Sequence, residues 1–237
     1  MASQDSKYGQ LDTSTITNLS FAIFPFDDFT HKRPTGDVEV LLRNGVAESH
    51  SIPNSSGYYL FLDILGERHD IVIRSDKYFE ATKTIDLVEL RTQDASFVKN
   101  PVIPIPLLPN ASYPFSPSST LIRGTVKSAP TNMDPNQRPV SNATVKVNKK
   151  VGQKDISCIT NENGDYILFF KDLLVGDTLP REENGIKKKF INFEGGFEFK
   201  LIIIHSDYEE YETESFLEGV EESKTKTIEK ILLTRRG

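Results

Sequence analysis

The segment TNENGDYILFF (residues 160–170) decides the fold, because it predicts a tight turn followed by a strand that is apolar on both faces. Asn163-Gly164 is a pair that tolerates positive φ at both central positions of a type I′ turn, which matches the twist of paired strands. Apolar side chains then occupy every position of residues 166–170. A strand covered on both faces lies centrally in a sandwich or meets another domain. The segment therefore predicts a β-hairpin within a β-sandwich.

An earlier segment, IPNSSGYYLFL (residues 52–62), matches it and indicates an internal duplication. Gly57 lies 107 residues before Gly164, and we expect Asn54–Gly57 to form a looser version of the same turn. Further pairs follow in the same order: Arg33-Pro34 with Arg138-Pro139, Val38 and Val40 with Val145 and Val147, and Ser75-Asp76 with Ser206-Asp207. The offset is 105 residues for the Arg-Pro pair, 107 for the valine and glycine pairs and 131 for the Ser-Asp pair, so the second copy has about 24 additional residues, near 175–198.

Short apolar or alternating runs recur along the chain and predict an all-β protein. They are rich in Val, Ile, Tyr and Phe, and clusters of Gly, Pro, Asn or Asp bound them. These runs are DVEVLL (37–42), YYLFLDI (58–64), DIVIRS (70–75), TVKV (144–147), DYILFF (165–170) and FKLIIIHS (199–206). Helical periodicity is weak throughout, and only TIDLVELRT (84–92) could form a helical turn.

The duplication predicts two domains joined by a linker. The expected parts are a flexible N-terminal segment (1–18), a first β-sandwich (19–109), a Pro/Ser linker (110–119) and a second β-sandwich (120–237). Proline and serine in the linker resist both helix and sheet. Tyr113 and Phe115 in this linker either cover domain edges or serve as candidate partner contacts.

The second copy resembles the carboxypeptidase regulatory-like domain, a transthyretin-type (prealbumin-like) β-sandwich of seven strands. The family marks are G-x-V, P-V-x-x-A-x-V-x-V and T-x-x-x-G-x-Y, at 124–126, 139–147 and 160–166. The first copy matches more weakly, because it lacks the glycine of the first mark and the threonine of the third. The resemblance implies two tandem seven-stranded transthyretin-like sandwiches. The tandem layout also resembles proteins of contractile phage-tail-like injection particles, which implies an accessory or adaptor role.

Composition argues against several classes of function. The formal net charge is −6 and the pI is near 5.4, whereas nucleic-acid binding needs a basic surface. The sequence has neither a run of about 20 apolar residues nor a secretory leader, so we expect no membrane insertion. The single cysteine, Cys158, fits a reducing compartment. The prediction is a cytoplasmic protein.

Motifs that carry catalytic or metal chemistry are missing from the sequence. None of the four histidines (His31, His50, His69 and His205) opens a His-x-x-Glu motif or has another histidine two to five residues away. The nucleophile elbow and the phosphate-binding loop are also absent. Cys158 lies in an apparent strand, where a small buried thiol is usual. We therefore predict a protein that is not an enzyme and has no cofactor.

These observations favour a non-catalytic structural or adaptor protein that docks into a larger assembly through sheet edges and loops. Its partners would be other proteins or further copies of the chain. Lys187, Lys188 and Lys189 in the insertion are candidate partner contacts or solvated residues. Seven glutamates between 209 and 222 form either a docking face or a solvated edge that discourages aggregation. The alternative is a carbohydrate- or small-ligand-binding sandwich, which the absence of tryptophan makes less favourable for sugars.

Overall fold

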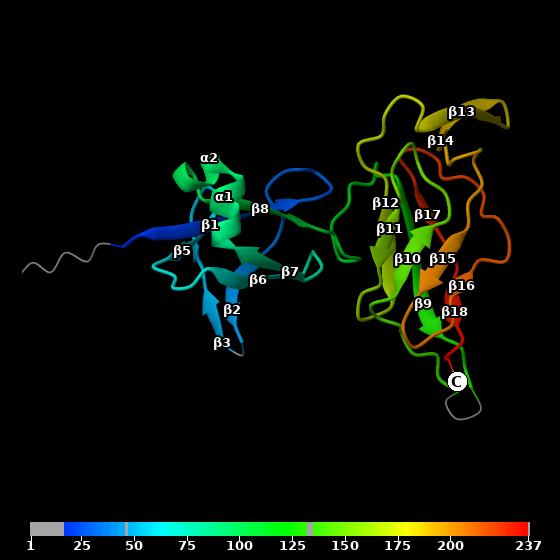
Figure 1. The fold of residues 1–237 in the computed structure, drawn as a ribbon. Helices are drawn as coiled ribbons and strands as arrows, with labels where there is room; N and C mark the ends of the chain where they lie inside the picture. The colour runs from blue at the N-terminus through cyan, green and yellow to red at the C-terminus, as the bar shows by residue number, and fades with distance from the viewer. Residues whose placement is uncertain (1–16, 46, 132–134, 237) are drawn as a thin grey trace, which may run out of the picture. The chain divides into compact units, whose positions relative to one another are not determined.

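A computed structural model describes residues 17–45, 47–131 and 135–236 (Figure 1). Among these residues the regular structure consists of eighteen strands and two short helices, so the predicted all-β class is confirmed. Residues 1–16 of the predicted flexible segment (1–18) lie outside the described residues.

The chain divides into two compact units. The smaller unit comprises Met1–Pro25, Val40–Val72 and Thr82–Ile105, and the larger comprises Phe26–Glu39, Ile73–Ala81 and Pro106–Gly237. Two segments of the N-terminal half therefore belong to the larger unit. The domain boundaries expected near residues 18, 109 and 119 stay a prediction.

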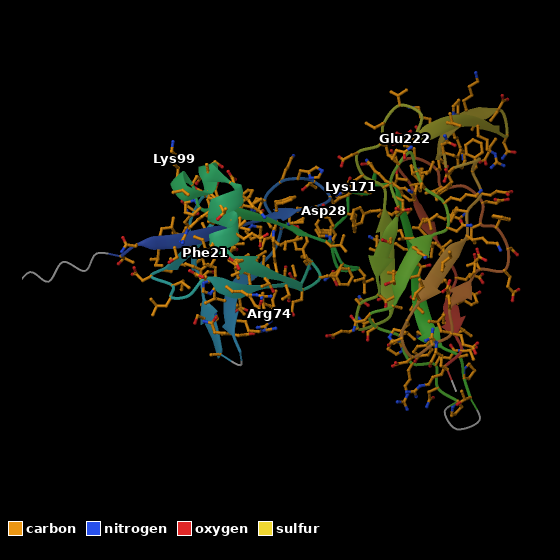
Figure 2. The ribbon with its side chains drawn as sticks, viewed as in Figure 1. Phe21, Asp28, Arg74, Lys99, Lys171 and Glu222 are labelled. Atoms are coloured by element: carbon orange, nitrogen blue, oxygen red, sulfur yellow. The ribbon has the colours of Figure 1, made fainter. Side chains whose placement is uncertain are left out.

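The N-terminal half forms two four-stranded sheets, with orders β4-β5-β1-β8 and β3-β2-β6-β7. Its elements are β1 (Leu19–Asp27), β2 (Val38–Asn44), β3 (Ala47–His50), β4 (Ile52–Pro53), β5 (Tyr59–Leu62), β6 (Arg68–Ser75), β7 (Ala81–Asp86), α1 (Leu87–Gln93), α2 (Ala95–Lys99) and β8 (Val102–Leu107). Phe21 of β1 contacts Phe61 of β5 and His69 of β6, with ring centroids 4.9 and 5.8 Å apart. The two sheets therefore face each other around Phe21 (Figure 2).

The C-terminal half repeats this arrangement, with orders β11-β10-β15-β16 and β12-β9-β17, and with β18 also paired to β9. Its elements are β9 (Leu121–Ser128), β10 (Thr144–Val147), β11 (Ser157–Ile159), β12 (Asp165–Phe169), β13 (Thr178–Glu183), β14 (Ile186–Ile191), β15 (Leu201–Ile204), β16 (Tyr211–Glu212), β17 (Thr225–Thr227) and β18 (Ile231–Leu233). One buried apolar cluster takes side chains from both sheets, among them Ile122, Val145 and Leu168. These two sheets therefore form a sandwich.

The strand orders show that the duplication extends to topology. β3-β2-β6-β7 corresponds to β11-β10-β15-β16, and β5-β1-β8 corresponds to β12-β9 followed by the interrupted strand β17/β18. Each copy thus has seven equivalent strand positions. The first copy adds the short β4 and the helices α1 and α2, and the second adds the separate pair β13-β14.

The helix α1 lies where the sequence predicts a helical turn, α2 follows it, and an aspartate caps the start of each helix. The side chain of Asp86 accepts hydrogen bonds from the backbone N–H groups of Val88 and Glu89, which caps α1. Asp94 caps α2 in the same way by accepting from the N–H of Ser96. This turn was expected over residues 84–92, and α1 confirms it.

The turn in TNENGDYILFF differs in type from the prediction. Asn161 O accepts from Gly164 N at 2.9 Å, and Asn161 Oδ1 accepts from the N–H groups of Asn163 and Asp165, each at 2.9 Å. Gly164 has a φ of +75°, whereas Asn163 has a negative φ. The predicted type I′ turn, which needs positive φ at both residues, is therefore wrong. The geometry is a type I turn followed by a left-handed glycine.

The first copy has the same turn and not the looser one that the sequence indicates. Asn54 O accepts from Gly57 N at 3.1 Å, and Asn54 Oδ1 accepts from the N–H groups of Ser56 and Tyr58 at 3.0 and 2.9 Å. Gly57 has a φ of +88°. Asn54 therefore corresponds to Asn161, and the repeated device is Asn-x-x-Gly with the asparagine side chain holding the loop.

The strands on either side of the second turn belong to different sheets. β11 pairs with β10, whereas β12 pairs with β9. The predicted hairpin is therefore wrong for this copy, because the turn carries the chain from one sheet to the other. In the first copy β4 and β5 do pair as a hairpin. The prediction of a strand buried on both faces is confirmed: Leu168 lies in the core, and Ile167 on the opposite face is 4% exposed.

Candidate functional site

The predicted insertion near 175–198 contains an antiparallel hairpin, β13–β14, which we call the arm (residues 178–191). Figure 1 shows the arm, in yellow, standing away from the two sheets of the C-terminal half. Its tip is a two-residue loop, Asn184-Gly185, with φ values of +53° and +77°. Positive φ at both residues is typical of a type I′ turn. A type I′ turn, which the sequence predicts at Asn163-Gly164, therefore lies at the arm tip.

A buried carboxylate holds the base of the arm. Asp177 is 7% exposed, and its Oδ2 accepts a hydrogen bond from the N–H of Leu174 at 2.8 Å. The carbonyl of Asp177 accepts from Asn192 N at 2.8 Å, and Asn192 Nδ2 donates to Gly176 O at 2.9 Å. These bonds join the two ends of the arm to each other, so its direction is defined at the base.

The outer edge of β14 pairs with residues 220–222 near the base. Ile191 N donates to Val220 O and Glu222 N donates to Lys189 O, both at 2.8 Å. The Phe190 ring is 5% exposed, and the Arg181 guanidinium lies 5.7 Å from its centroid. The arm is thus attached to the sandwich by backbone pairing as well as by side-chain packing.

The structure separates the three lysines that the sequence groups as candidate partner contacts. Lys188 Nζ lies 3.2 Å from Glu221 Oε2, and this hydrogen bond raises the pKa of Lys188. Lys189 Nζ lies 3.8 Å from Glu222 Oε2. Lys187 is exposed beside the tip and has no ion pair within the described part of the chain. Lys188 and Lys189 therefore tie the arm to its base, and a partner contact stays a prediction for Lys187, Lys188 and Lys189.

Apolar side chains are exposed on and beside the arm. Ile186 at the tip is 60% exposed, and Leu174 in the turn before β13 is 69% exposed. Val175 next to it is fully exposed. Burial of an aliphatic side chain of this size yields about 1.5–3 kcal/mol, so each is a ready contact for another surface.

Tyr113 of the predicted linker is buried, and its role as a partner contact stays a prediction. The side chain is 7% exposed, and its hydroxyl donates to Asp27 Oδ2 at 2.5 Å. Tyr78 donates to the same oxygen at 2.9 Å. Asp27 is 1% exposed, and a buried carboxylate needs several donors. Tyr113 is therefore held inside the larger unit by a residue 86 positions earlier.

Phe115 covers the outer face of β12 within the larger unit. Its ring centroid lies 4.6 Å from that of Tyr113, 5.1 Å from Phe29 and 5.8 Å from Phe169. Nearby, Lys171 Nζ lies 2.7 Å from Asp28 Oδ2 (Figure 2). Phe115 therefore packs against other aromatic rings of the larger unit, and its role as a partner contact stays a prediction.

The described residues offer few groups for chemistry. They contain no group of three His, Cys, Asp or Glu side chains that could hold a metal ion. Cys158 is 3% exposed, and burial raises the pKa of its thiol to about 12. Its thiol therefore stays protonated at neutral pH. No helix in residues 17–45, 47–131 and 135–236 is long and apolar enough to cross a bilayer.

A scan against family models and a search of curated proteins give no match. Among solved structures, the Bacillus anthracis TIE protein is 9% identical, with a TM-score of 0.28, over 91% of this chain and 33% of its own. A 9R-lipoxygenase from Cyanothece PCC8801 is 15% identical, with a TM-score of 0.26, over 53% of this chain and 18% of its own. A Ca2+-stabilized, ice-binding adhesin of an Antarctic bacterium is 9% identical, with a TM-score of 0.21, over 90% of this chain and 50% of its own.

This chain therefore spans half or less of each of these proteins. At these TM-scores the three likenesses carry no argument about the function of the chain.

Proposed function

We propose that this protein is a non-catalytic adaptor that docks into a larger protein assembly, and that the β13–β14 arm is its partner-binding element. The observation that carries the proposal is an arm fixed at its base but exposed at its tip, present in one copy of a duplicated sandwich.

The comparison between the two copies indicates that the arm is not needed for folding. The first copy has the same strand order without a counterpart of β13 and β14. Loops and insertions on a rigid framework carry binding residues more often than the framework does. The added residues are therefore the first place to look for specificity.

The attachment of the arm makes it suitable for binding. Backbone pairing at residues 189–191 and the hydrogen bonds of Asp177 fix its base before any partner arrives. A preorganised element loses less conformational entropy on binding than a loop that must become ordered. The type I′ turn at Asn184-Gly185 likewise limits the conformational freedom of the tip before binding.

The exposed residues of the tip define the chemistry of the partner. Ile186 fits an apolar pocket, and Lys187, which follows it on β14 and so points to the opposite face, fits a carboxylate on the other wall of a groove around the tip. Lys188 and Lys189 already have glutamate partners in the chain. We therefore expect a protein groove that takes one aliphatic side chain and has an acidic residue on its other wall.

The family resemblance of the sequence supports a setting within a multi-protein particle, of which a contractile phage-tail-like particle is the example it implies. In that setting the two sandwiches are the framework and the arm selects the site of attachment. The cytoplasm is the compartment that fits the single buried thiol.

Removal of the arm tests this function. Replacing residues 180–189 with Asn-Gly connects Leu179 to Phe190, which already face each other across the arm. We expect the shortened protein to fold, because none of the deleted residues belongs to the buried cluster. Quantitative mass spectrometry of pull-downs from native lysate should show loss of the proteins that the intact chain retains. Equal retention by the folded, shortened protein would contradict the proposal.

A further inference from the structure

A second candidate site lies at a notch in the sheet of the larger unit, away from the arm. β17 pairs with residues 121–123 of β9 and β18 pairs with residues 126–128, so the chain between β17 and β18 leaves Gly124 and Thr125 of β9 uncovered. A cavity of about 310 Å³ opens at this interruption. Its volume is at the lower end of the range for small-molecule sites.

Arg123 supplies an unused charge to the notch. Its Nε is buried and has no hydrogen-bond partner. No ion pair of Arg123 occurs within the described residues, although its guanidinium lies 5.9 Å from the Phe115 ring centroid. A buried charged donor without an acceptor is costly, and such groups commonly mark the place of a missing partner. The aromatic contact limits the directions that the guanidinium can take.

Asp165 supplies the opposite charge on the same face of the sheet. Asp165 pairs with Thr125 and Ile167 pairs with Arg123 across the two strands, so Asp165 and Arg123 are diagonal neighbours. Diagonal neighbours lie about 7–8 Å apart, and these two form no ion pair with each other in the described structure. Asp165 Oδ1 accepts from Thr125 Oγ1 at 2.9 Å, and its other oxygen has no such donor among these residues.

The charges and walls of the notch restrict the ligand. A simple anion such as phosphate would meet the Asp165 carboxylate, and a simple cation would meet the Arg123 guanidinium. A ligand with both charges satisfies both groups, because a carboxylate accepts from a guanidinium and an ammonium donates to a carboxylate. Ile167 and Ile228 line the same cavity and would contact an aliphatic side chain.

We propose that the Arg123–Asp165 notch binds a small zwitterion of the α-amino-acid class, with the ligand carboxylate on Arg123 and the ligand ammonium on Asp165. The volume of about 310 Å³ equals the share of about ten waters in the liquid, which suits a medium-sized amino acid. This inference is independent of the arm, because the notch lies on another surface and requires no protein partner.

Titration with L-leucine and two single-charge analogues tests the proposal. Isoamylamine lacks the carboxylate of leucine and isocaproate lacks the ammonium, while both keep the aliphatic chain. We expect leucine to shift the NMR cross-peak of the Arg123 Nε–H group. Each analogue and inorganic phosphate should bind at least about tenfold more weakly, a difference of about 1.4 kcal/mol.

Variants of the full chain identify the groups that bind. Arg123→Gln and Asp165→Asn should each weaken leucine binding at least about tenfold, since each removes one charge pair. Thr225→Val is the control, because Thr225 lies two residues before the notch residue Thr227 on the same strand. Absence of any Arg123 Nε–H shift at about 10 mM leucine, tenfold above a Kd of about 1 mM, would overturn the proposal. Unchanged leucine binding in the folded Arg123→Gln variant would also overturn it.

Discussion

Substitution of Gly164 by alanine tests whether the repeated Asn-x-x-Gly turn holds the second sandwich together. Gly164 has a φ of +75°, a conformation that alanine adopts at a cost of roughly 1–2 kcal/mol. An alanine Cβ would lie 2.3 Å from Val126 O, 3.2 Å from Val140 N and 3.3 Å from Pro139 Cβ. Two of these three atoms belong to the backbone, so they can move little to accommodate the added methyl group.

The crowding adds a second cost to the conformational one. Forcing extra volume into a well-packed site costs typically 1–3 kcal/mol. Val126 O also accepts a hydrogen bond from Val140 N at 3.1 Å, which any outward shift would weaken. We therefore expect Gly164→Ala to lower the free energy of unfolding by about 2–5 kcal/mol, the sum of both costs.

Gly185 at the arm tip provides the matched control. Its φ is +77°, close to that of Gly164, but an alanine Cβ there would have no neighbour within 4 Å. Gly185→Ala should therefore cost only about 1–2 kcal/mol. Urea unfolding followed by far-UV circular dichroism measures both, since the chain has no tryptophan for fluorescence. Equal losses in the two variants would refute the claim that crowding at the sheet-to-sheet turn matters.

Two further predictions concern the turn asparagines and the buried tyrosines. Asn161→Ala and Asn54→Ala each delete two side-chain hydrogen bonds, so each should cost about 1–3 kcal/mol, whereas Asn163→Ala should cost less because its side chain has no such role in the turn. Burial and the hydrogen bond to Asp27 raise the pKa of Tyr113, so its neutral form is favoured in the folded state. The stabilisation from this neutral tyrosine should be fully present below about pH 10. Above that pH the free energy of unfolding should fall by up to about 1.4 kcal/mol per pH unit per tyrosine. Urea unfolding at pH 9, 10 and 11 should show a shallower loss for Tyr113→Phe than for the wild type, and parallel curves would count against this assignment.

Local patterns in the sequence predict much of this fold. Alternating apolar positions locate most strands, and the rising offset between the copies locates the insertion, because both signals consist only of the order and spacing of residues along the chain. The two-sided burial of residues 166–170 follows from the same reasoning. The structure confirms these features, including the helical turn that becomes α1.

Features that depend on side-chain contacts outside a dipeptide or strand pattern were not predicted. The dihedral angles of Asn163 follow from hydrogen bonds to the side chain of Asn161, so the same Asn-Gly dipeptide forms a different turn at Asn184-Gly185. Tyr113 is buried because Asp27 lies beside it in space. An Asn-x-x-Gly signal was present in both copies of the sequence, and it could have identified Asn54 and Asn161.

The candidate site likewise has some features that the sequence predicts and others that it does not. The position of the insertion follows from the sequence, but its hairpin form and the attachment of Lys188 and Lys189 to Glu221 and Glu222 do not. Runs of like charge give no information about which member has an ion partner across the fold. The Arg123–Asp165 notch was equally hidden, since it arises where a strand is interrupted.

Partner binding by matched double variants decides whether the arm tip is the partner-binding element. Ile186→Ser with Lys187→Ser removes the exposed aliphatic and basic residues of the arm tip. Val98→Ser with Lys99→Ser removes an equivalent pair from α2. Val98 is 66% exposed, which matches the 60% exposure of Ile186 at the arm tip. With a co-purifying partner identified, the Kd of each variant is measured by calorimetry. We expect at least about tenfold weaker binding for the arm variant and wild-type binding for the α2 variant. Wild-type binding by the arm variant would contradict this expectation.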